Sequence, residues 1–258
     1  MKSLLLALIV AGPVASQTVA PPLPPAPYLK AGAVDVTQII QPAPVVHEPR
    51  YDADRKIFKQ TRKAIGTARY ALATSDVDYT VPAMARDFSC AAGVVLTRET
   101  APRLTLLIVR AGRDTARVSG TGKDFFKRLR PYQIDRGQTC QAPEELVGSF
   151  DYPSGHSTWG WTWGTILAEL MPERASAIEA RARAYGESRV ICGVHNASAV
   201  EAGRATATGT LSVVRASLDY QSDFAAARAE LAALRAAGQA PDAAGCATEA
   251  ALIAQHAY

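Results

Sequence analysis

The sequence lacks the features that mark several common classes of protein. Beyond its first residues, no stretch reaches the 18 or more uncharged apolar residues that indicate a membrane-spanning helix. The net charge is only +4, and no Lys/Arg run or aromatic-basic pattern indicates a nucleic-acid surface. No C-x2-C pair and no Cys/His cluster has the spacing of a zinc site, and His47-Glu48-Pro49 does not complete a helical HExxH motif. We therefore expect neither a membrane span, a nucleic-acid partner nor a metal site.

The N-terminus has the pattern of a secretory signal peptide. Lys2 precedes an apolar run over residues 4–10, and small residues follow up to Ser16. Because this run is too short to cross a bilayer, we predict a signal peptide over residues 1–16, removed on export. The mature protein is then expected in the periplasm or outside the cell.

Only four cysteines are present, Cys90, Cys140, Cys192 and Cys246. In an oxidising compartment this even number allows two disulfides, with three possible connectivities. We favour Cys90–Cys140, which would tie the segment before the Lys123 helix to the loop after it, and Cys192–Cys246 then follows by elimination. The alternative for Cys192 is a small buried core residue.

The rest of the chain divides into an arm and one helical domain. Residues 17–50 are rich in Pro, Ala and Val and predict an extended arm, because proline is excluded from helix interiors. Residues 51–258 show helical periodicity and no strand alternation, so we predict an all-α bundle in a single domain. Its apolar helical faces are compatible with a homodimer. The expected helices cover residues 54–72, 100–118, 123–129, 157–171, 172–185, 196–218, 224–237 and 248–256, with a loop over residues 130–152.

Three short segments carry the chemistry. In KDFFKRLRP, Lys123 and Arg130 are seven residues, or two helical turns, apart, so we expect both side chains on one face of a helix. Pro131 is expected to end that helix. In PSGH, Gly155 lets the backbone approach an anion at a helix start, Ser154 either donates to that anion or caps the helix, and His156 lies in the first turn.

The third segment is SRVICGVH, residues 188–195. Arg189 offers a planar fork for two phosphate oxygens, and His195 follows a glycine turn. No carboxylate lies between Arg189 and Glu201 to pair with these side chains. A bound anion would satisfy them, so the three segments together predict a phosphate site.

In order and spacing, these segments resemble the signature K-x6-RP … PSGH … SR-x5-H-x3-D of the type-2 phosphatidic acid phosphatase superfamily. The similarity is greatest to the secreted class A bacterial acid phosphatases and extends to DFSCAAGV, GWTWGTILAEL and AGRATATGT. The resemblance implies a phosphomonoesterase that needs no cofactor, with phosphomonoesters and inorganic phosphate as its ligands. His195 would attack phosphorus and His156 would protonate the leaving group. The phosphate oxygens would be held by Lys123, Arg130, Ser154, the Gly155 N–H and Arg189.

One position departs from the signature. The aspartate expected four residues after His195, which would orient its imidazole, is Ala199. Ser198 and Glu201 are the candidates to replace it, although Glu201 points about 120° away on an ideal helix. The alternatives to a phosphatase are an enzyme resembling the vanadate-dependent haloperoxidases and a phosphate-binding protein that lost turnover with its aspartate.

Overall fold

Every regular element in the described part of the chain is helical. The computed structural model describes residues 25–255 and 257–258, which contain α-helices and short 3-10 helices but no strand. The predicted all-α fold is therefore confirmed. The predicted signal peptide, residues 1–16, and residues 17–24 of the arm lie outside the described residues.

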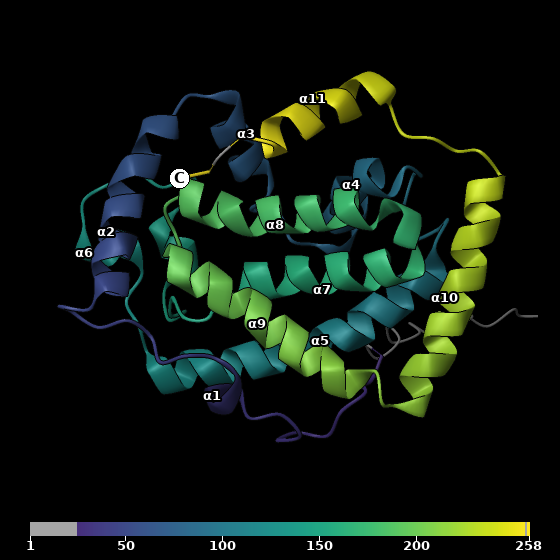
Figure 1. Ribbon diagram of the computed structural model, residues 1–258, viewed down its shortest axis with the longest axis horizontal. Coiled ribbons are helices and arrows are strands. Elements are labelled where there is room, and N and C mark those ends of the chain that lie inside the picture. Colours follow the sequence, from purple (N-terminus) through teal and green to yellow (C-terminus); the bar gives the residue numbers. More distant parts are fainter. Residues whose placement is uncertain (1–24, 256) are drawn as a thin grey trace, which may run out of the picture.

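Four helices form the centre of the molecule and the others surround them. Helices α5, α7, α8 and α9 lie side by side, α2 and α10 stand at opposite ends, and α11 packs across α3, α4 and α8 (Figure 1). The α-helices follow one another as α1 (Val36–Ile39), α2 (Pro49–Thr61), α3 (Ala68–Ser75), α4 (Val81–Ala92), α5 (Pro102–Phe126), α6 (Pro131–Ile134), α7 (Gly155–Leu170), α8 (Ala175–Ile191), α9 (Ala197–Val214), α10 (Leu218–Ala236) and α11 (Ala243–Ile253).

Glycines let α7 and α8 pack in close antiparallel contact. A Cβ at Gly164 would lie 2.4 Å from the Cβ of Ala182, and a Cβ at Gly160 would lie 2.5 Å from the ring of Tyr185. These distances are shorter than non-bonded carbon atoms tolerate, so only glycine fits. This register places the start of α7 against the end of α8, where two of the three predicted segments lie.

Several helix boundaries differ from prediction. Helix α4 was not expected, α8 extends to Ile191 rather than to residue 185, and α10 and α11 begin six and five residues before the expected positions. The helix expected over residues 54–72 is divided into α2, a 3-10 turn and α3, because Gly66 adopts a positive φ of 84°. The helices expected over residues 100–118 and 123–129 are the single helix α5, which ends at Lys127 with a φ of 46°. Arg130 therefore lies beyond the helix, and Pro131 begins α6 rather than ending α5.

The disulfide pairing is also different from the prediction. Cys90 on α4 is bonded to Cys246 on α11, and Cys140 is bonded to Cys192 at the end of α8. The predicted pairs Cys90–Cys140 and Cys192–Cys246 are wrong.

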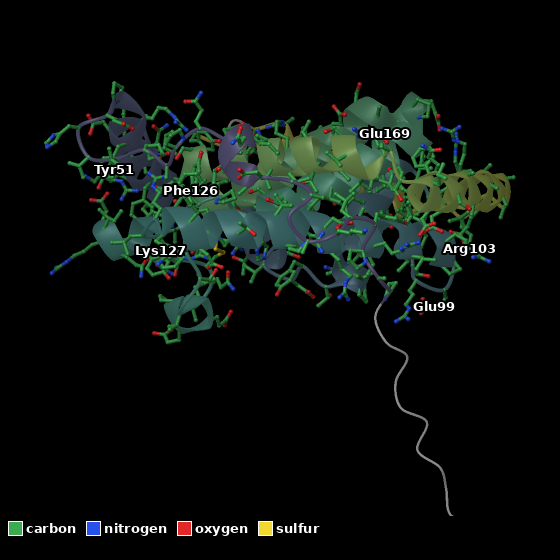
Figure 2. The ribbon with its side chains drawn as sticks, turned by 90° about the horizontal axis from the view of Figure 1, so that it is seen from below. Tyr51, Glu99, Arg103, Phe126, Lys127 and Glu169 are labelled. Atoms are coloured by element: carbon green, nitrogen blue, oxygen red, sulfur yellow. A yellow bond between two sulfur atoms is a disulfide. The ribbon has the colours of Figure 1, made fainter. Side chains whose placement is uncertain are left out.

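The disulfide pairing follows from where the long helices place their ends, and α5 is the longest helix of the described residues. Its 25 residues span about 37 Å at 1.5 Å per residue. Figure 2 shows Arg103 and Lys127, near its two ends, on opposite sides of the molecule. The predicted pair Cys90–Cys140 is not formed because its members lie at opposite ends of α8, Cys90 beside Arg174 before the helix and Cys140 beside Cys192 after it. The 17 residues of α8 span about 25 Å, whereas the Cα atoms of a disulfide must lie within about 7 Å.

The described part of the proline-rich segment lies along α5. The backbone N–H of Tyr28 donates to Asp114 at 2.7 Å, and its hydroxyl donates to Asp223 on α10 at 2.7 Å. The one-turn helix α1 follows, and Val36 is buried against Val118 of α5 and Ala202 of α9. The segment thus joins helices that are distant in sequence.

We expect Gly203→Ala to destabilise the protein. A Cβ at Gly203 on α9 would lie 2.6 Å from the carbonyl oxygen of Ser154, and such overpacking costs about 1–3 kcal/mol. The control is Gly120→Ala on α5, where a Cβ would meet no atom within 4 Å and alanine favours the helix by about 0.5–1 kcal/mol. Urea unfolding measures both variants. An unchanged free energy of unfolding for Gly203→Ala would contradict the close approach of α9 to this turn.

Candidate active site

The three predicted segments meet at one pocket. The pocket has a volume of about 710 Å³ and lies between α5, the start of α7 and the end of α8. The predicted site residues that line it are Lys123, Arg130, Gly155, His156, Arg189 and His195.

His195 is buried, and both of its ring nitrogens have partners. Its Nε2 lies 3.1 Å from an Nη1 of Arg130, and its Nδ1 lies 2.9 Å from Oδ1 of Asp151. A guanidinium can only donate, so Nε2 accepts and the ring proton is on Nδ1, where it is donated to the carboxylate. Burial and the nearby cations Arg130, Lys123 and Arg189 hold the pKa of His195 well below its ordinary value. The ring is therefore neutral, with the Nε2 lone pair on the pocket side.

Asp151 is a site residue that the sequence analysis missed. It precedes PSGH by two residues and is fully buried. Its Oδ1 also accepts from the backbone N–H of Asn196 at 3.1 Å, and its Oδ2 accepts from the Asn196 amide at 2.7 Å. Arg128 lies 3.4 Å from Oδ2. Burial raises the pKa of Asp151, but four donors converge on its two oxygens, the arrangement of an ionised carboxylate. In the sequence, Asp151 could be recognised only as one acidic residue in the loop predicted over residues 130–152.

The two residues predicted to orient His195 lie elsewhere. The Ser198 hydroxyl donates to Asp54 of α2 at 2.5 Å and accepts from Arg128 at 2.7 Å. Glu201 is largely exposed and pairs with Arg204 at 2.9 Å, one turn along α9. Neither contacts His195, because α9 starts only at Ala197 and its first turn faces α2. The carboxylate that contacts Nδ1 of His195 is that of Asp151, and neither candidate makes this contact.

Lys123 and Arg130 are held in the pocket by backbone oxygens. Lys123 Nζ donates to the carbonyl of Phe150, and Arg130 donates to the carbonyls of Ser149 and Val194, each at 2.8 Å. Burial, together with the charge of Arg130, lowers the pKa of Lys123 to about 7. The two cations share the pocket although they do not share a helix face.

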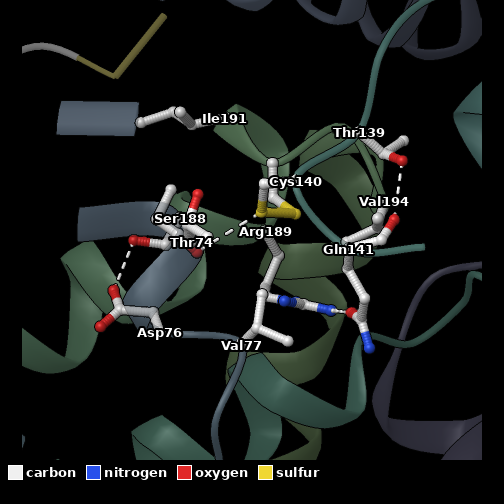
Figure 3. Close-up of a disulfide and its surroundings, with 12 residues drawn as sticks. Thr74, Asp76, Val77, Thr139, Cys140, Gln141, Ser188, Arg189, Ile191 and Val194 are labelled. Carbon is white, nitrogen blue, oxygen red and sulfur yellow. Dashed lines mark hydrogen bonds between the residues drawn. A yellow bond between two sulfur atoms is a disulfide. The ribbon is translucent and has the colours of Figure 1, made fainter. Parts of the chain in front are cut away.

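Arg189 has hydrogen-bonding capacity left over for an anion. It is fully buried, and burial lowers its pKa to about 10. Nη2 donates to Oε1 of Gln141 at 2.5 Å, whereas Nε and Nη1 have no partner among the described residues. Gln141 follows Cys140, which the disulfide to Cys192 fixes beside the last turn of α8 (Figure 3). Buried donors without partners are rare in folded proteins and indicate a site for a ligand with acceptor atoms.

The start of α7 presents its backbone to the pocket. Ser154 is the N-cap, and its Oγ accepts from the N–H of Ser157 at 3.3 Å. Its side chain is fully buried, so the observed contact is the capping one, and donation to phosphate stays a prediction. Gly155 and His156 do line the pocket. The N-terminal end of a helix attracts anions through its free N–H groups and its dipole.

His156 is fixed by one hydrogen bond and two aromatic rings. Its Nε2 lies 3.1 Å from the carbonyl oxygen of Val77, so Nε2 carries a proton and Nδ1 is free to exchange one. Tyr79 packs edge-on against the ring at 4.8 Å, and Tyr185 stacks on it at 6.2 Å. Burial and Arg189 hold the pKa of His156 well below its ordinary value.

The described residues contain neither a candidate metal cluster nor a candidate membrane-spanning helix. Among them, no group of three or more His, Cys, Asp or Glu side chains is arranged to hold a metal ion. No helix within residues 25–255 is long and apolar enough to cross a membrane.

Known proteins of similar sequence are acid phosphatases. The PAP2 superfamily model matches residues 104–223. An acid phosphatase from Zymomonas mobilis is 37% identical over 195 residues, which are 74% of this chain and 74% of that protein. A non-specific acid phosphatase from Providencia stuartii is 30% identical over 241 residues, covering 88% of this chain and 97% of its own. One from Salmonella typhimurium is 31% identical over 198 residues, covering 74% and 78%.

The chain therefore belongs to the PAP2 superfamily. Within that superfamily it belongs with the acid phosphatases, which are phosphoric monoester hydrolases, as the resemblance of its three segments predicted.

We expect the two disulfides to differ in their effect on the site. Replacing both cysteines of either bond by serine should destabilise the protein by about 2–5 kcal/mol. Only loss of Cys140–Cys192 should also weaken inhibition by inorganic phosphate, by roughly 10-fold, because Gln141 would no longer be held against Arg189. Inhibition constants for the two double variants measure the difference. Equal weakening in the Cys90–Cys246 variant would show that the effect is one of general stability.

Proposed function

We propose that this chain is an exported, non-specific acid phosphatase that hydrolyses phosphomonoesters through a phosphohistidine at His195. The observation that carries the proposal is the tautomer of His195. Its Nε2 lone pair lies at the wall of a pocket that also contains three cationic side chains, Lys123, Arg130 and Arg189. A nucleophile surrounded by cations is what transfer of a phosphoryl group requires.

In the first step, the Nε2–phosphorus bond forms and the ester P–O bond breaks. The three cations neutralise the charge on the equatorial oxygens, and the N–H groups at Gly155 and after it add the partial charge of the α7 N-terminus. Arg130, which donates to Nε2 in the resting site, moves its hydrogen bond to a phosphate oxygen. Because side chains of the protein supply the positive charge, the mechanism needs no metal ion.

His156 handles the proton in both steps. In the first step it gives a proton from Nδ1 to the leaving alkoxide. In the second it takes a proton from the water that attacks phosphorus and releases phosphate from His195. Nearby cations lower the pKa of His156, and the charge of a bound phosphate dianion raises it again, so the acid form is favoured once substrate is bound.

The aromatic and small residues that line the pocket support broad specificity. Tyr79, Trp159, Ala116 and Gly120 are among them, so the leaving group meets aromatic rings and small groups. These surfaces bind by packing and discriminate weakly between leaving groups.

Two features support export. The predicted signal peptide precedes the domain, and all four cysteines form disulfides, which persist in oxidising compartments. We infer that the enzyme acts in the periplasm or outside the cell.

We expect His195→Ala to abolish turnover and phosphoenzyme formation. Wild-type enzyme mixed with radiolabelled phenyl phosphate in excess chelator and quenched in alkali should retain an acid-labile label, because phosphohistidine is stable to base. His156→Ala should slow an alkyl phosphate by roughly 10²–10⁴ and slow nitrophenyl phosphate less, because nitrophenolate leaves without a proton. A label that persists in His195→Ala would show that another residue is the nucleophile.

We expect kcat/KM to fall as pH rises through about 7, in part because Lys123 loses its charge there. A lowered lysine pKa means that the cation is present below that pH and absent above it. Lys123→Arg should move this limb upward by about a unit or more, since arginine stays charged. Lys127→Arg, on the exposed end of α5, is the control. Identical pH profiles for wild type and Lys123→Arg would assign the limb to His156 or to the substrate.

A further inference from the structure

The nucleophilic histidine has its carboxylate partner in an unexpected part of the chain. The family signature places the carboxylate four residues after the histidine, where this chain has Ala199. In the structure the partner is Asp151, from the loop before α7, at 2.9 Å from Nδ1 of His195. We propose that Asp151 is the positioning residue that holds His195 in its attacking tautomer, and that it replaces the carboxylate missing from position 199. This inference rests on the proposed function.

Position 199 is built for an apolar side chain. Ala199 is fully buried in a cluster with Val118, Tyr152 and Ala202. Its carbonyl accepts from the N–H of Ser154 at 2.9 Å, which ties the first turn of α9 to the PSGH turn. A carboxylate at 199 would be buried in an apolar cluster beside the residue that follows Asp151, which disfavours an ionised group. In this chain the buried carboxylate is therefore at position 151, and position 199 is apolar.

Asp151 is held more firmly than one hydrogen bond to His195 would require. Asn196 donates to it twice, from its backbone and from its side chain. Arg128 lies between Asp151, at 3.4 Å, and Asp54, at 2.8 Å. Because both oxygens are occupied, the carboxylate has one orientation, and the direction of the Nδ1 hydrogen bond is fixed with it.

The chemical role follows from the proton on Nδ1. When Nε2 bonds to phosphorus, the imidazole becomes a cation, and the proton remains on Nδ1. The buried carboxylate at 2.9 Å stabilises that cation as it forms, and the cation disappears again when water breaks the Nε2–phosphorus bond. Arg130 on the other face has only donors to offer, so it favours the same tautomer.

Asp151→Asn is the sharpest test because it keeps the shape and changes the donors. If the NH₂ of the introduced amide faces Asn196 and Arg128, it meets two other donors, and the hydrogen bond from Asn196 and the ion pair with Arg128 are lost. If it faces His195, Nδ1 must become the acceptor, and the ring proton moves to Nε2. In a serine-protease triad the equivalent change of tautomer lowers kcat by about 10⁴. We expect kcat for phenyl phosphate to fall by about 10²–10⁴ and the inhibition constant of inorganic phosphate to change less than about 3-fold.

Asp54→Asn is the matched control. It removes a negative charge from the same Arg128 and also disturbs Ser198, but it does not touch His195. If Asp151 served only to neutralise Arg128, the two variants would have equal kcat. We expect Asp54→Asn to retain kcat within about 10-fold while Asp151→Asn loses it.

A spectroscopic measurement tests the proposal without any variant of Asp151 and without turnover. Nitrogen-15 NMR of the resting wild-type enzyme, with the His195 signal identified by its loss in His195→Gln, should show a neutral ring protonated on Nδ1. A ring protonated on Nε2 would overturn the proposal, as would equal kcat in Asp151→Asn and wild type. If the wild type hydrolyses no phosphomonoester but His195 shows the Nδ1–H tautomer, the proposed function fails and the positioning role of Asp151 stands.

Discussion

The site depends on burying three cations close together. Lys123, Arg130 and Arg189 are buried close together, and the loss of hydration, with the charges of Arg130 and Arg189, lowers the pKa of Lys123. Buried charges without compensation cost several kcal/mol, so the fold has to supply acceptors. It does so mainly with backbone carbonyls of Ser149, Phe150 and Val194. In the proposed mechanism a phosphate dianion compensates the remaining charge, so substrate binding relieves a cost that folding has imposed.

The helical framework brings these charges together from segments that are distant in the sequence. Close packing through glycines places the start of α7 against the end of α8, so His156 and Arg189 share one pocket. The disulfide Cys140–Cys192 fixes the loop that follows α6 to the same end of α8. The loop before α7 then passes over Lys123 and delivers both a carbonyl and a carboxylate to the site. The relative positions of the pocket side chains therefore depend on contacts between α7, α8 and this loop more than on any single helix.

The sequence predicted the fold class and most of the pocket, and its limits have physical causes. Short motifs encode local features, so the glycine at a helix start, the arginine in the last turn of α8 and the histidine after a turn were all recognisable. The boundary of α5 was missed because the chain turns at Lys127, a residue without a strong preference for positive φ. The disulfides were mispaired because pairing depends on which helix ends meet in space. Asp151 was missed for the same reason, because a hydrogen bond between residues 44 apart leaves no pattern in the spacing.

Because Asp151 lies in a loop, the orientation of His195 depends on contacts between segments that are distant in the sequence. A carboxylate one turn along α9 would keep its relation to the histidine as long as that short stretch held its conformation. Asp151 keeps it only while the loop before α7, the start of α9 and Arg128 remain packed together. Arg128 also pairs with Asp54 of α2, the helix at one end of the molecule, so it joins α2 to this loop (Figure 1). The two hydrogen bonds from Asn196 come from the residue next to His195 itself, so the carboxylate stays directed at Nδ1 even when the contact between Arg128 and α2 is weakened.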